Sequence, residues 1–363
     1  MTDVLVVDAR VPEPALVARA AACLRAGGLV AFPTETVYGL GAHAADPNAV
    51  QRLFAAKGRP PTDPLIVHVA SLDSLTTVVA SVPPAAVLLA QRFWPGPLTL
   101  VLPRSLAVPS EVTAGLGTVG VRIPSHPVAL ALIRAAGVPV AAPSANLFSR
   151  PSPTTAAHVL QDLDGRIDMV VDGGPTVVGI ESTVLDLSGE IPIVLRPGAV
   201  TLAMLRDVLP ETVAREGSVA PDGGAMPSPG MLTRHYAPRA PLTLYESRRD
   251  DSMVARMLAD ARALVHTGQR VGILAADEDR AAFDTEPGLR VTCLGSIARI
   301  EAVAARLYAA LRAFDEASVD VILARGFPAD TGFGTAVQDR LRRASSGRIV
   351  HVSTDSSADR RSR

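Results

Sequence analysis

Short apolar runs recur along the first two hundred residues, and segments with apolar positions three and four apart lie between several of them. Such runs, bounded by turn residues, are typical of buried strands, whereas the second pattern predicts amphipathic helices. The predicted strands are 29–32, 65–69, 98–102, 119–123, 138–142, 169–171, 182–187 and 193–195. The predicted helices are 13–27, 47–57, 84–93, 126–136, 154–163 and 201–209. This succession predicts a mixed α/β sheet domain over residues 1–209.

The pattern of apolar and polar residues changes after residue 209. Residues 210–240 are rich in Pro and Gly and show no periodicity, which predicts a linker. Beyond them the predicted strands are 242–245, 271–275, 291–294 and 319–323, and the predicted helices are 251–267, 296–314 and 333–344. Strands separated by helices of this length predict a smaller, doubly wound, Rossmann-like domain over residues 241–352. We expect residues 353–363 to form a disordered tail.

The composition narrows the class of protein. A hydrophobic fraction of 48% with 20% charged residues is typical of a globular protein. The formal net charge is −1, whereas a protein that held nucleic acid mainly through phosphate contacts would have a basic excess. The two cysteines, Cys23 and Cys293, provide neither a disulfide framework nor a CxxC pair, and the histidines lack metal-ligand spacing. We therefore expect no metal site built by the protein itself.

The sequence argues against membrane insertion or secretion. Asp3 and Asp8 lie within the stretch that a signal peptide would keep apolar. The longest apolar run, residues 127–143, is interrupted by Arg134 and Gly137, so it would not cross a bilayer. We expect a cytoplasmic protein without membrane contact.

The familiar glycine loops for nucleotides are missing from the sequence. Residues 115–120 match the spacing GxGxxG, but the glycines continue directly into a predicted strand instead of a helix. No GxxxxGK[ST] occurs. If the chain binds ATP, it does so by another arrangement.

Polar side chains collect at the ends of the predicted strands. Hydroxyls and a carboxylate follow the first strand in the segment PTETVYG, at a density that a turn alone does not need. Arg122 alternates with the apolar residues of its strand, so it lies either at a sheet edge or in a cleft. His68, taken alone, fits a hydrogen-bonded core position better than a ligand position. Lys57, Arg59, Arg122 and Arg196 together supply cations suited to a triphosphate and a carboxylate.

Lys57 is the only lysine among 35 basic residues. A lone lysine in an arginine-rich chain suggests a position where a planar guanidinium cannot replace a compact ammonium, although survival by chance is the alternative. Exposed basic pairs such as Lys57 and Arg59 are often only solvated surface.

The motifs FPTETVYGLG, KGRP with PLIVHV, FWPGPLTLVLP, VGVRIP, APSAN with PSPT, ESTV and LRPG occur in this order across roughly residues 15–208. They resemble the YrdC-like domain of threonylcarbamoyl-AMP synthases. SPG followed by HYAP, and the α/β domain after them, resemble the long two-domain form. The resemblance implies a twisted mixed sheet with helices and a Rossmann-like C-terminal domain. It also implies a nucleotidyltransferase that converts L-threonine, bicarbonate and ATP into threonylcarbamoyl-AMP and pyrophosphate, for N6-threonylcarbamoyladenosine formation in tRNA.

The resemblance assigns roles to individual residues. Lys57 and Arg59 would be catalytic, and our hypothesis is that Lys57 mainly activates the carbamate. The residues expected on the ATP side are Arg59, Asp63, Thr118, Ser144, Asn146, Ser152, Arg196 and Tyr236. Those expected on the threonine side are Thr34, Thr36, His68, Arg122, Ala142 and Ser182, with Arg122 pairing with the threonine carboxylate.

The resemblance also implies partners and a moving part. Mg²⁺ would accompany ATP, and the product would pass to a complex that transfers it to tRNA. The linker would fold back as a lid that brings Tyr236 over the site. Thr233 departs from the aromatic residue usual in relatives, which weakens the assignment of Arg234 and His235 to the lid.

Two other functions remain open at this point. Carbamoyl transfer, as in hydrogenase-maturation proteins with a similar domain, would require zinc-finger cysteines that two distant cysteines cannot supply. Binding of double-stranded RNA would use a basic concave face, which the near-neutral charge disfavours as the main role, although the cleft could still contact tRNA.

Overall fold

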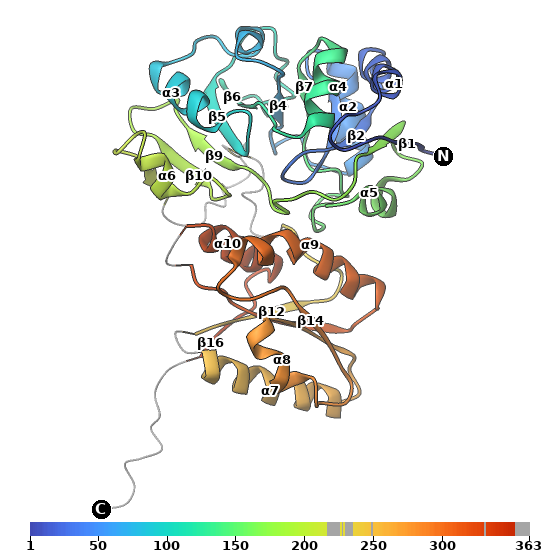
Figure 1. Ribbon diagram of the computed structural model, residues 1–363, viewed down its shortest axis with the longest axis vertical. Coiled ribbons are helices and arrows are strands. Elements are labelled where there is room, and N and C mark those ends of the chain that lie inside the picture. The colour runs from blue at the N-terminus through green and yellow to red at the C-terminus, as the bar shows by residue number, and fades with distance from the viewer. Residues whose placement is uncertain (216–225, 227, 229–234, 248–249, 330–331, 353–363) are drawn as a thin grey trace, which may run out of the picture.

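Two sheets form two domains, stacked along the long axis of the molecule (Figure 1). The computed structural model describes residues 1–215, 226, 228, 235–247, 250–329 and 332–352. Most of the predicted lid, including Thr233 and Arg234, and the tail predicted at 353–363 lie outside these residues. No helix in the described ranges is long and apolar enough to cross a membrane.

The N-terminal domain contains an eleven-stranded mixed sheet with the strand order β1-β8-β2-β3-β7-β4-β6-β5-β9-β10-β11. The strands are β1 (Asp3–Val6), β2 (Val30–Pro33), β3 (Tyr38–His43), β4 (Ile66–His68), β5 (Leu98–Pro103), β6 (Thr118–Arg122), β7 (Val140–Ala141), β8 (Met169–Asp172), β9 (Thr183–Asp186), β10 (Ile193–Arg196) and β11 (Val213–Ala214). Each predicted strand is present, with ends that differ by a few residues. Strands β1, β3 and β11 were not predicted. The segment with GxGxxG spacing runs into β6, as expected.

Helices cover this sheet, and short connections join them to the strands that follow. They are α1 (Pro14–Arg25), α2 (Pro47–Lys57), α3 (Pro84–Phe93), α4 (Pro127–Ala136), α5 (Ala156–Leu163) and α6 (Leu202–Arg206), with a 3-10 turn η1 at Asp73–Thr77. All six predicted helices are confirmed. Their buried faces and the strands form two large apolar clusters, one on each side of the sheet, and residues of β4, β5, β9 and β10 form a third, smaller cluster.

Helix α2 shows how local sequence positions a polar group. Asp46 is its N-cap, and the carboxylate accepts a hydrogen bond of 2.9 Å from the backbone N–H of Asn48. Pro47 occupies the first helical position, and Gly58 ends the helix with a left-handed φ of 63°. The helix therefore ends at Lys57, at a defined point behind the strand ends.

Replacing Asp46 by alanine should lower the free energy of unfolding by about 1 kcal/mol, because the first turn of α2 loses its cap. Chemical denaturation of the purified protein would measure the change. Asp46→Asn keeps a capping oxygen and should remain close to the wild type. An equal loss in both variants would contradict the capping explanation.

The C-terminal domain contains a five-stranded parallel sheet with the order β14-β13-β15-β12-β16. The strands are β12 (Leu242–Glu246), β13 (Val271–Ala275), β14 (Leu289–Cys293), β15 (Val321–Arg325) and β16 (Ile349–His351). The helices are α7 (Asp250–His266), α8 (Arg280–Phe283), α9 (Ile300–Glu316) and α10 (Gly334–Ala344), with a 3-10 turn η2 at Asp277–Asp279. The predicted doubly wound sheet is confirmed, while β16 and α8 were not predicted.

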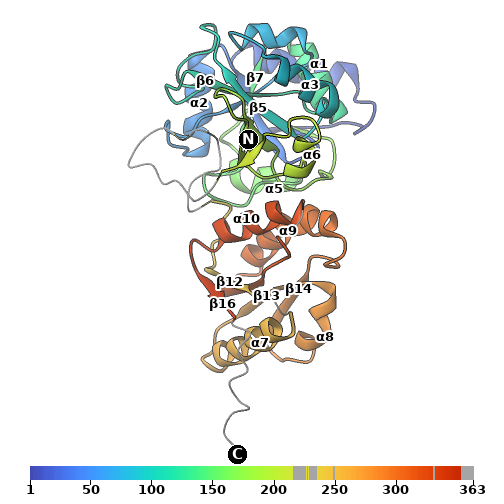
Figure 2. The same ribbon diagram turned by 90° about the vertical axis from the view of Figure 1, so that its left-hand side faces the viewer.

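Helices α9 and α10 lie between the two sheets in both views, and α7 lies on the far side of the C-terminal sheet (Figures 1 and 2). Ile180 of the N-terminal domain is fully buried in the same apolar cluster as Leu307 and Leu311 of α9. Arg312 of α9 donates a hydrogen bond of 2.8 Å to the buried carboxylate of Asp162 in α5. The contact between the two domains therefore contains both buried apolar residues and a pair of opposite charges.

Candidate active site

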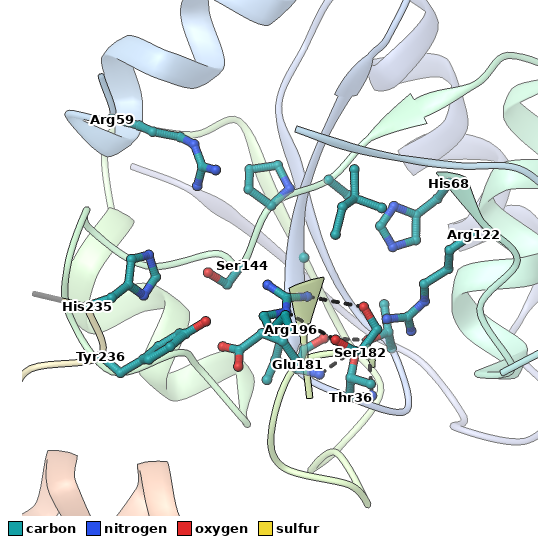
Figure 3. Close-up of a pocket in the computed structure, with 16 residues that line it drawn as sticks. Thr36, Arg59, His68, Arg122, Ser144, Glu181, Ser182, Arg196, His235 and Tyr236 are labelled. Atoms are coloured by element: carbon teal, nitrogen blue, oxygen red, sulfur yellow. Dashed lines mark hydrogen bonds between the residues drawn. The ribbon is translucent and has the colours of Figure 1, made fainter. Parts of the chain in front are cut away.

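A pocket opens on the N-terminal domain, at the ends of several strands and next to the contact with the C-terminal domain (Figure 3). Arg59 and His235 lie at one end, and His68 and Arg122 lie at the other. The residues that line it are Thr34, Thr36, Val37, Gly39, Arg59, Ile66, His68, Arg122, Ala142, Pro143, Ser144, Glu181, Ser182, Arg196, His235 and Tyr236. Segments from residue 34 to residue 236 thus build one cavity.

Ten of the residues expected in the site line this pocket. They are all six threonine-side residues (Thr34, Thr36, His68, Arg122, Ala142 and Ser182) and four from the ATP side (Arg59, Ser144, Arg196 and Tyr236). Lys57, Asp63, Asn146 and Ser152 lie behind the lining, and each is at most 1% exposed. Thr118 lines a smaller neighbouring cavity with Thr99 and Gly120, which shares Ile66 with the main pocket.

Arg122 is aimed into the pocket, away from the core that Val119 and Val121 enter. The alternation predicted for this strand is thus confirmed. Its guanidinium donates hydrogen bonds of 2.8 Å to the carboxylate of Glu35 and 3.1 Å to the hydroxyl of Thr36. Its Nε has no partner among the described residues. A buried guanidinium with an unused donor is suited to a carboxylate ligand.

His68 lies next to Arg122 at the same end of the pocket (Figure 3). Burial and, secondarily, the charge of Arg122 lower the pKa of His68 to about 3. The imidazole is therefore neutral near pH 7 and offers hydrogen bonds without charge. In the part of the chain that the structure describes, its Nδ1 has no partner. A core histidine with satisfied nitrogens, the simpler expectation, does not describe this residue.

Arg59 is held by the loop that follows α2. Its Nη2 lies 3.0 Å from the carboxylate of Asp63 and donates a 2.7 Å hydrogen bond to the carbonyl of Pro64. Its Nε donates to the carbonyl of Asp63. Asp63, expected on the ATP side, is fully buried and orients the Arg59 guanidinium from behind.

Lys57 contacts backbone, and it does not line the pocket. Its Nζ donates hydrogen bonds of 2.5 Å to the carbonyl of Ser144 and 2.7 Å to the carbonyl of Asn146. Burial and then the Arg59 charge lower the pKa of Lys57 well below its ordinary value. The two hydrogen bonds from Nζ therefore pin the loop that carries Ser144. Asn146 strengthens the same loop by donating to the carbonyls of Leu147 and Arg150.

Ser182 and Arg196 are joined to each other. Arg196 donates from Nε to the Ser182 carbonyl at 3.1 Å and from Nη2 to the Ser182 hydroxyl at 3.2 Å. That hydroxyl lies 2.8 Å from the hydroxyl of Thr99. The start of β9 and the end of β10 are thereby fixed beside the middle of the pocket.

Sequence reasoning gave no role to Glu181, which lines the pocket between Tyr236 and Ser182 (Figure 3). Its carboxylate accepts a hydrogen bond of 2.5 Å from Ser152, which explains why that predicted ATP-side residue lies behind the lining. It also accepts from Tyr308 of α9 and Arg340 of α10. One sequence signal was available, because Arg340 interrupts the apolar stripe formed by Val337, Leu341 and Ala344.

His235 and Tyr236 are buried at the edge of the pocket. The Tyr236 ring lies 4.1 Å from the His235 ring and 5.4 Å from the Tyr308 ring, and Arg340 lies 5.3 Å above it. The Tyr236 hydroxyl and the His235 Nδ1 have no partner within the described ranges. The described end of the predicted lid thus contributes polar atoms to the pocket and packs on the C-terminal domain.

Comparisons with known proteins agree with this architecture. Residues 22–198 match the family described as Telomere recombination, and residues 200–346 match the family described as Threonylcarbamoyl-AMP synthase, C-terminal domain. A threonylcarbamoyl-AMP synthase of Bacillus subtilis is 47% identical over 92% of this chain and 94% of that protein. The chain belongs to the threonylcarbamoyl-AMP synthase family. The family predicted from the motifs is thus confirmed, and membership makes the chain an enzyme.

Other members of the threonylcarbamoyl-AMP synthase family support the match over the full length. The synthase of Pyrococcus abyssi is 46% identical over 92% of this chain and 95% of that protein. A crystal structure of Pyrococcus abyssi Sua5, described as complexed with L-threonine, has a TM-score of 0.90 at 43% identity. It covers 97% of this chain and all of that one, so both domains share one arrangement.

Gly179 links the domain contact to the pocket. Its φ is +80°, and an added Cβ would lie 2.4 Å from the Cα of Ala305 in α9. Its N–H donates to the carbonyl of Thr36, and the N–H of Val178 donates to the carbonyl of Glu35. The segment that contacts α9 therefore also supports the loop that contacts Arg122.

Gly179→Ala should lower the free energy of unfolding by about 2 kcal/mol, because the methyl group overlaps backbone and the left-handed φ disfavours alanine. It should also weaken L-threonine binding through the Thr36 loop. Denaturation and calorimetric titration would measure the two effects. Gly174→Ala is the matched control, since Gly174 has a φ of +81° in the same loop with nothing within 4 Å of an added Cβ. Equal losses in both variants would show that backbone strain alone is responsible.

Proposed function

We propose that the chain forms L-threonylcarbamoyl-AMP and pyrophosphate from L-threonine, bicarbonate and ATP, as a nucleotidyltransferase that serves the N6-threonylcarbamoyladenosine modification of tRNA. The observation that carries the proposal is a single pocket in which different parts of the lining carry different polar groups. One end has Arg122, a neutral His68 and hydroxyls, which suit an amino acid, whereas Arg59 at the other end and Arg196 near the middle suit phosphates (Figure 3). The Pyrococcus abyssi protein described as bound to L-threonine has the same fold.

At the threonine end, Arg122 binds the amino-acid carboxylate. Its Nη2 is already paired with Glu35, so the ligand uses Nε and the side of the guanidinium that faces the pocket. Thr36 and Ser182 offer hydroxyls, and His68 offers a neutral nitrogen to the threonine side chain. This arrangement selects a small polar amino acid, because a site that hydrogen-bonds a substrate hydroxyl rejects analogues without one.

The chemistry needs positioning more than a protein base. The amine of threonine and bicarbonate condense to a carbamate with loss of water. A carbamate oxygen then attacks the α-phosphorus of ATP, a P–O bond to the β-phosphate breaks, and pyrophosphate leaves. Because the attacking group is already an anion, the protein aligns it and neutralises charge on the phosphates. Arg59 and Arg196 supply that charge, and Lys57 holds the loop that presents Ser144.

Mg²⁺ enters the proposal with ATP as part of the substrate. Within the described ranges, no group of three or more His, Cys, Asp or Glu side chains is placed to hold a metal ion. The phosphate oxygens themselves are the natural ligands of Mg²⁺, with waters completing its coordination. We further propose that the reaction occurs in the cytoplasm and that the product passes to a tRNA-modifying transfer complex, with contact to tRNA at the cleft left to experiment.

The test is pyrophosphate release by the purified full-length protein with Mg·ATP, bicarbonate and L-threonine, each omitted in turn. Release that requires all three, with a product of the mass of threonylcarbamoyl-AMP, is expected. L-Alanine, which lacks the hydroxyl, should not replace L-threonine. Release without threonine would point to another acceptor of the AMP group, and no release would favour carbamoyl transfer or RNA binding instead.

A further inference from the structure

The C-terminal domain contacts the carboxylate of Glu181, a residue of the pocket lining, as well as the ring of Tyr236. Glu181 is 6% exposed, and both of its oxygens accept hydrogen bonds from buried groups. Tyr308 donates at 2.9 Å to Oε2, and Arg340 donates from Nε at 2.8 Å to the same oxygen. Ser152 donates to Oε1. Two of the three donors come from helices of the other domain, more than a hundred residues away along the chain.

This carboxylate lies among cations that are needed for phosphate. Arg196, whose Nε and Nη2 point at Ser182, has the largest charge effect on Glu181 after Arg340. Burial alone would raise the pKa of Glu181, but Arg340, then Arg196 and the hydrogen bonds from Ser152 and Arg340, lower it to about 2. His235 and Tyr236 face the same carboxylate from the end of the linker. Glu181 is therefore a permanent anion in the native protein.

We propose that Arg340 and Tyr308 are positioning residues for the ATP side of the site, which act by holding the Glu181 carboxylate toward the C-terminal domain and so keep it from pairing with Arg196, which lines the pocket beside Ser182. The inference rests on the proposed function. It gives the C-terminal domain a part in the reaction that is separate from holding the linker.

The physical reason is competition between two guanidiniums for one carboxylate. Arg340 is fully buried and cannot reach the pocket lining, so its pairing with Glu181 costs the site no phosphate ligand. If Arg340 is removed, Arg196 is the cation with the largest remaining charge effect on the carboxylate, and it lines the same pocket and is bonded to the adjacent Ser182. An ion pair between Glu181 and Arg196 would neutralise the guanidinium at the moment when it should bind a phosphate.

A substitution at Tyr308 separates the hydrogen bond to Glu181 from ring packing against Tyr236. Burial and the Glu181 charge raise the pKa of Tyr308 well above its ordinary value, so its hydroxyl remains a donor. Tyr308→Phe removes only that hydroxyl and keeps the ring that packs at 5.4 Å from Tyr236. An effect of this variant on ATP therefore passes through Glu181.

The experiment measures pyrophosphate release by full-length variants while ATP is varied at saturating L-threonine and bicarbonate. We expect the KM for ATP to rise about tenfold in Tyr308→Phe and about a hundredfold in Arg340→Met, because hydrogen bonds and ion pairs to a buried charge are lost. The KM for L-threonine and kcat should change much less. Arg340→Lys, which keeps a cation, should restore much of the ATP affinity.

Two further measurements distinguish the proposed effect of Arg340 on ATP binding from a purely structural role. Adding Glu181→Gln to Arg340→Met should bring the KM for ATP back toward the wild type, because the uncharged side chain no longer competes for Arg196. For the same reason the KM of Arg340→Met should fall as pH decreases through the raised pKa of Glu181. The wild type should lack this dependence above pH 4, since its Glu181 pKa is about 2.

Arg342→Met is the matched control, because Arg342 lies on the same helix and pairs with Glu246 within its own domain. It should leave the KM for ATP unchanged. If wild-type activity is present but folded Tyr308→Phe and Arg340→Met keep normal ATP kinetics, the inference is overturned and the proposed function stands. It is also overturned if Glu181→Gln deepens the defect of Arg340→Met. Absence of threonine-dependent release in the wild type would instead reject the proposed function.

Discussion

Replacing Arg122 by methionine should raise the KM for L-threonine by about a hundredfold, which corresponds to about 3 kcal/mol for a lost pairing between buried charges. The guanidinium is 3% exposed, and its Nε has no partner among the described residues, so a ligand carboxylate gains an otherwise unused donor. Methionine fills the space of the side-chain stem without the charge. Steady-state kinetics with L-threonine varied at saturating ATP would measure the effect, and the KM for ATP should change little.

Loss of Arg122 also leaves the Glu35 carboxylate buried without its cation. The variant is therefore expected to be less stable, and denaturation should accompany the kinetics. Glu35→Gln separates the two effects, because it keeps Arg122 in place and removes only the ion pair. It should retain threonine affinity within a few-fold. A folded Arg122→Met enzyme with an unchanged KM for L-threonine would disprove the assignment of Arg122 to the carboxylate.

Apolar runs predicted the strands that are buried on both faces, such as β2 and β5, because nearly every residue in them must be apolar or small. Strand β3 escaped prediction because its sequence YGLGAH is neither continuous nor alternating. Its glycines have a packing reason that only the fold reveals. An added Cβ on Gly41 would lie 2.9 Å from the ring of Phe32 and 3.0 Å from Val140, so neighbouring strands occupy that space.

The direction of a side chain in the site could be predicted from the sequence where the strand that carries the residue determines that direction. The alternation around Arg122 gave the direction of its side chain correctly. Periodicity does not specify partners, however, and the bond between Glu181 and Arg340 joins residues 159 positions apart. The same limit applies to Lys57, where the sequence indicated an unusual position but could not show that its Nζ contacts carbonyls. Family motifs likewise brought Ser152 and Asn146 into the candidate list, although both lie behind the pocket lining.

Lys57→Met should lower kcat/KM by about a hundredfold or more, because two buried carbonyls lose their donor and each buried group left unsatisfied costs about 1–3 kcal/mol. The loop that carries Ser144 would then lose its fixed position, and ATP kinetics and kcat should both suffer. Lys57→Arg should not rescue the activity. A planar guanidinium is larger than an ammonium, and Lys57 is only 1% exposed, with donors already directed at both carbonyls.

The Lys57→Arg variant tests whether the single lysine is retained by chance or is required by the geometry of its hydrogen bonds. Full activity of Lys57→Arg would mean that any cation suffices, and both the geometric requirement for a lysine and the hypothesis of carbamate activation would fail. Arg52→Met is the matched control on α2, since Arg52 pairs with Asp168 at the surface and should leave kinetics unchanged. Two of the three ammonium donors are used by the Ser144 and Asn146 carbonyls. A defect in kcat alone, at unchanged stability and ATP affinity, would therefore assign the third donor to the reacting carbamate.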